Sequence, residues 1–153
     1  MNFEEAMTLA IKVAQDAVTK SADVPVGAVI LNSKSEVVAT GSNQRELEND
    51  PTAHAEIVAM RRAAAKLGSW RLEDHTLVVT LEPCAMCAGA IVQSRIPRVV
   101  FGAWDEKAGA VGSVWDVLRD PRTLNKPEVI TGVMADECAQ LLQAFFQGQR
   151  KGN

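Results

Sequence analysis

The chain has 153 residues, of which 47% are hydrophobic and 23% are charged, so it can build one ordinary globular core and has little room for a second. Its net charge of −3 argues against a non-specific nucleic-acid coat protein, because phosphate contacts usually leave a basic excess, although a local basic patch is not excluded. The chain shows neither a signal-peptide pattern at its start nor an apolar run of membrane-spanning length. We therefore expect one soluble, cytoplasmic domain over residues 1–153, with no membrane partner.

Patterns typical of helices and of strands alternate along the first part of the chain. Apolar residues at helical spacing predict an amphipathic helix over residues 3–19, and the apolar run 24–31 predicts a buried strand. The polar turn 32–35 is too short for a crossover helix. Residues 36–41 should therefore form a second strand that is antiparallel to the first.

A polar loop over residues 43–52 leads into a predicted helix at 53–67. Asp50 can cap this helix, Pro51 suits its first position and Gly68 suits its exit. The remaining predicted elements are a strand at 76–81, a helix at 85–94, a strand at 98–102, a weak strand at 128–131 and a helix at about 136–147. Strands that alternate with helices predict a three-layer α/β/α domain.

The three cysteines are too few, and odd in number, for the disulfide framework of a secreted protein. Cys84 and Cys87 lie three residues apart at the start of a predicted helix, which places both sulfur atoms on one helix face. A Cys-x-x-Cys pair directly after a strand fits a metal site and a thioredoxin-like redox site equally well. This pair alone leaves both alternatives open.

A His-x-Glu motif, His54 and Glu56, favours the metal site. Both residues lie at the start of the predicted helix 53–67, from where their side chains can reach an ion beyond the helix end. A catalytic zinc ion takes three protein ligands and keeps a fourth position open, and His54, Cys84 and Cys87 supply three. Glu56 then remains free to carry protons between water and a substrate nitrogen.

The other residues that could bind metal are expected elsewhere. Cys138 lies in an apolar helical pattern and should be buried, and His75 opens a strand beside Asp74 and should lie at the surface. A closed structural zinc site would need one of them as a fourth ligand. A zinc-free redox site would have no use for the His-x-Glu motif. The sequence therefore favours a catalytic zinc site.

These motifs resemble the signature of the zinc-dependent cytidine/deoxycytidylate deaminase superfamily. They are Pro51, His54-Ala55-Glu56 and Pro83-Cys84-Ala85-Met86-Cys87. Longer stretches resemble the bacterial tRNA-specific adenosine deaminases along nearly the whole chain: VPVGAVI at 24–30, NDPTAHAEI at 49–57, TLEPCAMCAGAI at 80–91, RVVFGAWDEKAGAVGS at 98–113 and ADECAQLLQAFF at 135–146.

The resemblance implies a cytidine-deaminase-like fold with a central five-stranded mixed sheet, one zinc ion per chain and a homodimer. It also implies an activity, the hydrolytic conversion of adenosine to inosine at the wobble position of an arginine tRNA, with release of ammonia. The partner would be the anticodon stem-loop, whose unpaired bases can enter a pocket at little energetic cost.

Individual roles are also implied by the resemblance. The zinc ligands would be His54, Cys84 and Cys87, Glu56 would be the catalytic proton shuttle, and Asn43 would bind the flipped nucleoside. Further positions lining the RNA-facing pocket match Val26, Asp50, Ala55 and Phe146. The alternatives are that Asn43 is a turn residue, that Val26 belongs to the core and that Phe146 packs the last helix.

One departure from the family pattern is Trp104, in a loop position that carries an arginine in some members. Stacking on its ring can replace a contact with the RNA backbone. Because the net charge is acidic, RNA binding would depend on a local cationic rim, for which Lys107, Arg150 and Lys151 are candidates.

Three other functions stay open at this point. A deaminase of a free nucleobase or nucleoside, such as cytosine or guanine, would share the zinc site and differ in the surrounding pocket. A non-catalytic RNA-binding module would have no need of Glu56. A Cys-x-x-Cys oxidoreductase would bind no zinc.

Overall fold

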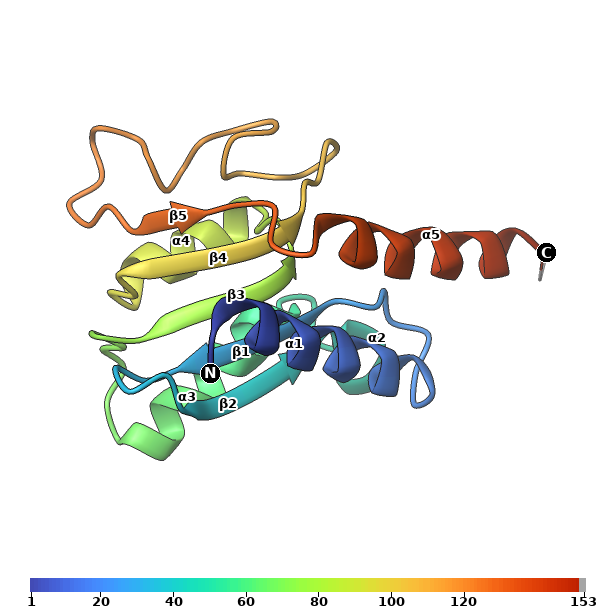
Figure 1. Cartoon of the computed structure of the whole chain (residues 1–153), viewed down its shortest axis with the longest axis horizontal. Coiled ribbons are helices and arrows are strands. Elements are labelled where there is room, and N and C mark those ends of the chain that lie inside the picture. The colour runs from blue at the N-terminus through green and yellow to red at the C-terminus, as the bar shows by residue number, and fades with distance from the viewer. Residues whose placement is uncertain (152–153) are drawn as a thin grey trace.

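A computed structural model describes the backbone of residues 1–151 and the side chains of residues 1–149. Five strands in this part of the chain form one mixed sheet in the order β2-β1-β3-β4-β5, with helices on both faces (Figure 1). The strands are β1 (Gly27–Leu31), β2 (Val37–Ser42), β3 (Thr76–Leu81), β4 (Arg98–Ala103) and β5 (Glu128–Ile130). This arrangement confirms the predicted α/β/α fold.

The direction of the strands decides where side chains can gather. β1 is antiparallel to β2, as predicted, and also to β3, whereas β3, β4 and β5 are parallel. In the turn between β1 and β2, the side-chain oxygen of Asn32 accepts hydrogen bonds from the backbone N–H groups of Lys34 (2.9 Å) and Glu36 (3.0 Å). The carboxyl ends of β3 and β4 meet at one edge of the sheet, so the segments that follow them leave side by side.

The helices cover the sheet in two pairs. α1 (Phe3–Val18) and α5 (Ala135–Lys151) pack on one face, and α3 (Ala55–Leu67) and α4 (Ala85–Gln93) pack on the other (Figure 1). Successive residues of β3 alternate between the two core clusters: Leu77 and Val79 face α3 and α4, whereas Val78 faces α1 and α5. Burial on both faces explains the unbroken apolar runs in the sequence. No helix in the described part of the chain is long and apolar enough to span a bilayer.

The predicted start of α3 was wrong. The helix begins at Ala55, and Asp50 does not cap it. Instead, the Asp50 carboxylate accepts hydrogen bonds from the N–H (2.9 Å) and hydroxyl (2.8 Å) of Thr52 and forms an ion pair with Arg61 (3.1 Å). These bonds close a turn that contains Pro51, so the chain turns once more before it becomes helical. Gly68 ends α3 with φ at 73°, as predicted.

A short helix, α2 (Arg45–Glu48), lies in the segment predicted to be a loop. It is held by the buried carboxylate of Asp23, which accepts hydrogen bonds from the N–H groups of Glu46 (2.8 Å) and Leu47 (3.2 Å). These hydrogen bonds lower the pKa of Asp23 even though burial acts in the opposite direction. The cap comes from more than twenty residues away, so local sequence patterns do not reveal it.

The two spare metal-binding candidates had different outcomes. Cys138 is 1% exposed and packs between α5 and the sheet, which confirms its predicted burial. The prediction for His75 was wrong, because its side chain is buried and its Nδ1 lies 2.6 Å from the carbonyl oxygen of Glu73. The intervening Asp74 has a positive φ of 61°, so the backbone reverses just before β3 and brings the ring and this carbonyl together.

Candidate metal centre

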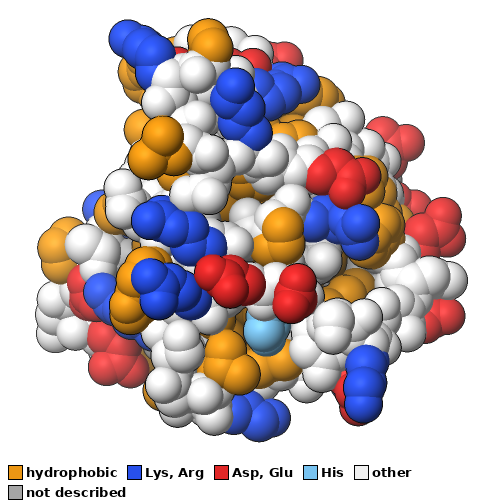
Figure 2. All heavy atoms as spheres, turned by 90° about the vertical axis from the view of Figure 1, so that its left-hand side faces the viewer, with side chains coloured by type: hydrophobic (Ala, Val, Ile, Leu, Met, Phe, Trp, Pro, Cys, Tyr) orange, Lys and Arg blue, Asp and Glu red, His pale blue; other side chains and the backbone are white. Residues whose placement is uncertain are grey.

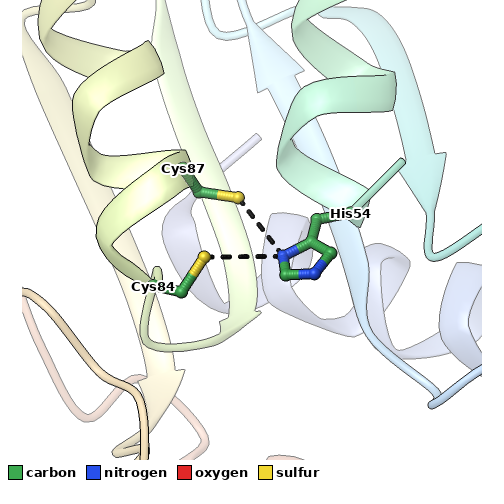
Figure 3. Close-up of side chains that lie close together, drawn as sticks. All are labelled: His54, Cys84 and Cys87. Carbon is green, nitrogen blue, oxygen red and sulfur yellow. Dashed lines mark hydrogen bonds between the residues drawn. The ribbon is translucent and has the colours of Figure 1, made fainter. Parts of the chain in front are cut away.

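The N-termini of two helices, α3 and α4, lie side by side beyond the carboxyl edge of β3 (Figure 3). His54 is the N-cap residue of α3 and Cys84 is the N-cap residue of α4, and both have extended backbone conformations. Neither side chain makes a capping hydrogen bond, so the imidazole and the thiol are available for another partner. Cys87 follows in the first turn of α4 and is fully buried.

The three side chains converge on one point (Figure 3). Nδ1 of His54 lies 3.5 Å from Sγ of Cys84 and 3.5 Å from Sγ of Cys87, and the three donor atoms lie within 4.8 Å of one another. Tetrahedral zinc, with bonds of about 2.3 Å to sulfur and about 2.05 Å to nitrogen, separates such donors by about 3.6 Å. The predicted triad therefore has the spacing and the donor chemistry of a three-ligand zinc site.

The electrostatics of the triad also favour a cation. A hydrogen bond from Cys87, followed by the one with His54, lowers the pKa of the Cys84 thiol. The pKa of Cys87 is raised, because it donates to Cys84 and because it is buried. His54 has a raised pKa, caused first by its hydrogen bond with Cys84. The donors thus share protons that a divalent cation would displace, and two thiolates with a neutral imidazole would balance its charge.

Glu56 lies in the first turn of α3 and is 4% exposed. Burial raises its pKa to about 7, although its own backbone N–H and the charge of His54 act in the opposite direction. Its carboxyl group also hydrogen-bonds to the side chain of Cys87. A buried carboxyl group beside the donors, with a pKa near neutrality, can both accept and release a proton.

Asn43 supports the helix that carries His54. Its side-chain oxygen accepts a hydrogen bond of 2.8 Å from the N–H of Ala55, which is the first residue of α3. This N–H is one of those that a helix leaves without an internal partner. Asn43 is thus a cap supplied from the end of β2, a role that the sequence did not predict.

Asn43→Ala should lower the free energy of unfolding by about 1 kcal/mol, as loss of a helix cap does. It should also weaken zinc binding, because the start of α3 positions His54. Asn43→Asp keeps the acceptor oxygen and should restore most of both losses. Urea unfolding and zinc titration would measure the two effects. Unchanged stability in Asn43→Ala would contradict the capping role.

The other predicted contact residues have different surroundings. Val26 and Ala55 are buried in the core between the sheet and α3 and α4. Asp50 is engaged with Thr52 and Arg61 in the turn before His54. Asp50 also lines a surface cavity beside α3, and Phe146, which is 47% exposed, lines a different one.

The cavity lined by Phe146, of about 450 Å³, lies between α5 and the loop after β4. Trp104, Lys107 and Phe146 contribute to its walls, and Val24, Leu81 and Leu142 add apolar surface. The Trp104 ring is 46% exposed and packs edge-on against Phe101, with ring centroids 4.9 Å apart and planes at 85°. The cavity thus combines two exposed aromatic rings with one basic side chain, Lys107, and two acidic ones, Asp105 and Glu106. We refer to it below as the aromatic cavity.

One residue of the site was missed by the sequence analysis. Glu82 is 2% exposed and binds the loop after β4 with both carboxylate oxygens. The sequence did contain a signal. Glu82 lies directly between an apolar strand and the Pro83-Cys84 motif, where burial is expected, and acidic residues are seldom buried without a specific partner.

The fold and the metal centre together define the class of protein, which is a zinc-binding deaminase domain. A family model described as the cytidine and deoxycytidylate deaminase zinc-binding region matches residues 1–103. The chain therefore belongs to this deaminase family and, by the relatives below, to the group of tRNA-specific adenosine deaminases within it.

The tRNA-specific adenosine deaminase of Bacillus subtilis is 47% identical over 95% of this chain and 89% of its own length. A solved structure of a tRNA:A34 deaminase is 41% identical, with a TM-score of 0.86 over 90% of this chain and 99% of that one. The Bacillus subtilis guanine deaminase structure is 31% identical, with a TM-score of 0.67 over 99% of this chain and 95% of that one.

Proposed function

We propose that the chain hydrolyses adenosine to inosine at the wobble position of a tRNA, that of arginine in particular, with release of ammonia. The observation that carries the proposal is the His54, Cys84 and Cys87 triad with the buried Glu56 beside it. The names of the relatives support adenosine in tRNA as the substrate. An enzyme with this substrate would act in the cytoplasm, as a single domain over residues 1–153.

In this proposal, His54 Nδ1 and the sulfur atoms of Cys84 and Cys87 hold one zinc ion per chain. A zinc ion held there would supply Lewis acidity, which would activate water for attack on C6 of adenine. Glu56 takes one proton from the water and carries it to the ring nitrogen. It then takes the second proton from the hydroxyl group added at C6 and delivers it to the departing amine. Its pKa near 7 suits both directions of transfer.

The aromatic cavity supports a single-stranded RNA substrate. A reacting purine must leave its base stack, which costs little in a hairpin loop, and aromatic rings can then stack on neighbouring bases. Trp104 and Phe146 offer such rings, and Lys107 offers a charge for phosphate. The side chains of Arg150 and Lys151 lie outside the described residues, so the proposed cationic rim depends here on Lys107.

The edge of the sheet opposite the zinc donors, where β3 and β4 begin, is less suited to RNA. Figure 2 shows the face at the left of Figure 1, where acidic side chains lie beside the groups of basic ones. Arg71 lies 4.0 Å from Glu73 just before β3, and Arg98 at the start of β4 pairs with Glu128 at 2.9 Å. We therefore place the RNA at the carboxyl edge of β3 and β4, where the zinc donors lie.

Trp104→Ala should raise KM for an anticodon stem-loop by roughly 5- to 150-fold, because one base–aromatic stack contributes about 1–3 kcal/mol. The zinc content should not change, since Trp104 is not among the donors. Trp70→Ala is the matched control, because Trp70 is 55% exposed and does not line the aromatic cavity. Equal KM values for the two variants would remove the proposed stacking role.

The proposal includes a homodimer. Apolar side chains are exposed at the start of α4 and in the loop before β5, which is unusual for a surface that faces only water. They are Met86 (37% exposed), Val114 (45%), Trp115 (55%) and Leu124 (95%). Light scattering after size-exclusion chromatography should give twice the chain mass, and a monomer at micromolar concentration would contradict this part of the proposal.

The competing function is deamination of a free base, which the likeness to a guanine deaminase keeps open. An experiment that separates the two offers the protein an arginine anticodon stem-loop with adenosine at the wobble position, and separately adenosine, guanine and cytosine. Mass spectrometry should find inosine in the stem-loop and no turnover of the small molecules. Turnover of a free base with no inosine in the stem-loop would replace the tRNA proposal with the competing one.

A further inference from the structure

The carboxylate of Glu82 is buried after β3, where it accepts four hydrogen bonds from one loop. Oε1 accepts from the N–H of Asp105 (2.9 Å) and from the Ser113 hydroxyl. Oε2 accepts from the N–H groups of Val111 (2.9 Å) and Ser113 (3.1 Å). No ion pair of Glu82 is found among the described side chains. The charge of Glu82 is thus compensated by loop 105–113 itself.

The same loop is bound to the segment that carries the metal ligand. The N–H of Ala110 donates to the carbonyl oxygen of Pro83 at 2.8 Å, and Gly109 forms an antiparallel bridge with Cys84. A Cβ atom at Gly109 would collide with the Glu82 carboxyl group, so the loop approaches this side chain as closely as a glycine permits. Loop 105–113 therefore rests directly on residues 82–84.

The other side of the loop forms a wall of the aromatic cavity. Asp105 donates its N–H to Glu82, and with its side-chain oxygen it accepts hydrogen bonds from the N–H groups of Lys107 (3.1 Å) and Ala108 (3.2 Å). These three residues and Trp104, which directly precedes them, all line the cavity. A shift of the Glu82 carboxylate would therefore move the wall of the cavity through Asp105.

We propose that Glu82 is a positioning residue, which holds loop 105–113 in the shape that forms the aromatic cavity and thereby sets the affinity for the RNA substrate. Glu82 takes no part in the proton transfers, which belong to Glu56. This inference rests on the proposed function, because it takes RNA as the occupant of the cavity.

Glu82→Gln tests the proposal with almost no change in volume. An amide nitrogen cannot accept a hydrogen bond, so at least one backbone N–H of the loop would face another donor in either orientation of the glutamine, since only the Ser113 hydroxyl can turn to accept. In the full-length zinc-loaded protein, we expect amide hydrogen exchange at residues 105, 111 and 113 to accelerate by about tenfold or more, with exchange in α1 unchanged. KM for the stem-loop should rise by about tenfold while kcat changes by less than about twofold, and zinc should remain at about one per chain.

Two further variants accompany this measurement. Ser113→Ala removes only the hydroxyl donor and should produce a smaller change in the same direction, which keeps the test available where Glu82→Gln does not fold. Glu4→Gln is the control for the loss of an acidic charge, because Glu4 is an exposed acid of α1 that does not line the aromatic cavity. It should leave amide exchange and KM unchanged.

Unchanged exchange at residues 105, 111 and 113 in Glu82→Gln would overturn the positioning role, whatever the substrate. Faster exchange with an unchanged KM would overturn the link to RNA affinity, and loss of zinc would show that Glu82 supports the metal ligand instead. Where the wild-type protein leaves the stem-loop unmodified, the proposed function fails. The exchange experiment, which needs no RNA, then still decides whether Glu82 positions the loop.

Discussion

Cys87→Ala is expected to release the zinc ion and to abolish deamination at the same time. Cys87 is fully buried and supplies one of the three donor atoms, so its removal leaves two ligands. Two protein ligands fall below the three that catalytic zinc sites retain, and the remaining thiolate and imidazole bind the ion less tightly. We expect metal analysis to find well under one zinc per chain and the rate to fall to background.

Cys138→Ala is the matched control for this experiment. It makes the same chemical change at a cysteine that is 1% exposed and lies in the core between α5 and the sheet. This variant should lose some stability through the small cavity it creates, but it should keep its zinc and its activity. Added zinc should raise the melting temperature of metal-free wild-type protein and of Cys138→Ala, but not of Cys87→Ala. Full zinc content in Cys87→Ala would contradict the assigned triad.

Glu56→Gln is expected to keep the zinc ion and to lose the reaction. Glutamine preserves the size of the side chain but cannot carry a proton between water and the substrate. General acid–base catalysis typically contributes about 10²- to 10⁴-fold, so we expect kcat to fall by at least that range, because Glu56 serves more than one transfer. Zinc should stay at about one per chain, since Glu56 lies outside the donor triad.

Metal analysis and single-turnover kinetics on the same preparation would separate the two roles of Glu56. Glu48→Gln, at an exposed position of α2, should behave like the wild-type protein. A Glu56→Gln protein without zinc would make Glu56 a ligand. A variant that keeps most of its rate would mean that another group moves the protons.

The core of the site could be predicted from sequence because its geometry is local. Cys84 and Cys87 lie three residues apart, so they share one helix face. His54 and Glu56 lie two residues apart and would diverge within a helix, but at the start of α3 both can still reach a point beyond the helix end. That the two pairs meet at one point depends on the sheet. The alternation of strands and helices predicted the layers, and the family resemblance supplied the pairing of the two motifs.

Features that depend on contacts between distant residues were not predictable in this way. The cap of α2 comes from Asp23, and the cap of α3 comes from Asn43. Asp50 appeared to be a helix cap because the pattern Asp-Pro is typical of helix starts, but its carboxylate is used by Thr52 and Arg61. In each case a side-chain oxygen had several donors within reach, and tertiary structure selected one of them.

The role of Glu82 within the site could not be predicted from sequence for the same reason. Its four hydrogen bonds come from a loop that begins more than twenty residues later in the chain, and no periodic pattern connects the two. The sequence showed an acidic residue beside a metal-ligand motif, which is also typical of a solvated helix start.

The central claim, hydrolytic deamination of a wobble adenosine, is tested most directly by the origin of the oxygen atom in the product. An anticodon stem-loop of arginine tRNA would be incubated with the zinc-loaded protein in water enriched in oxygen-18, and the RNA would be digested and analysed by mass spectrometry. We expect inosine at the wobble position only, carrying one oxygen-18 atom at C6, and none with Glu56→Gln. Inosine without the heavy oxygen, or no inosine at all, would contradict hydrolytic deamination of this adenosine.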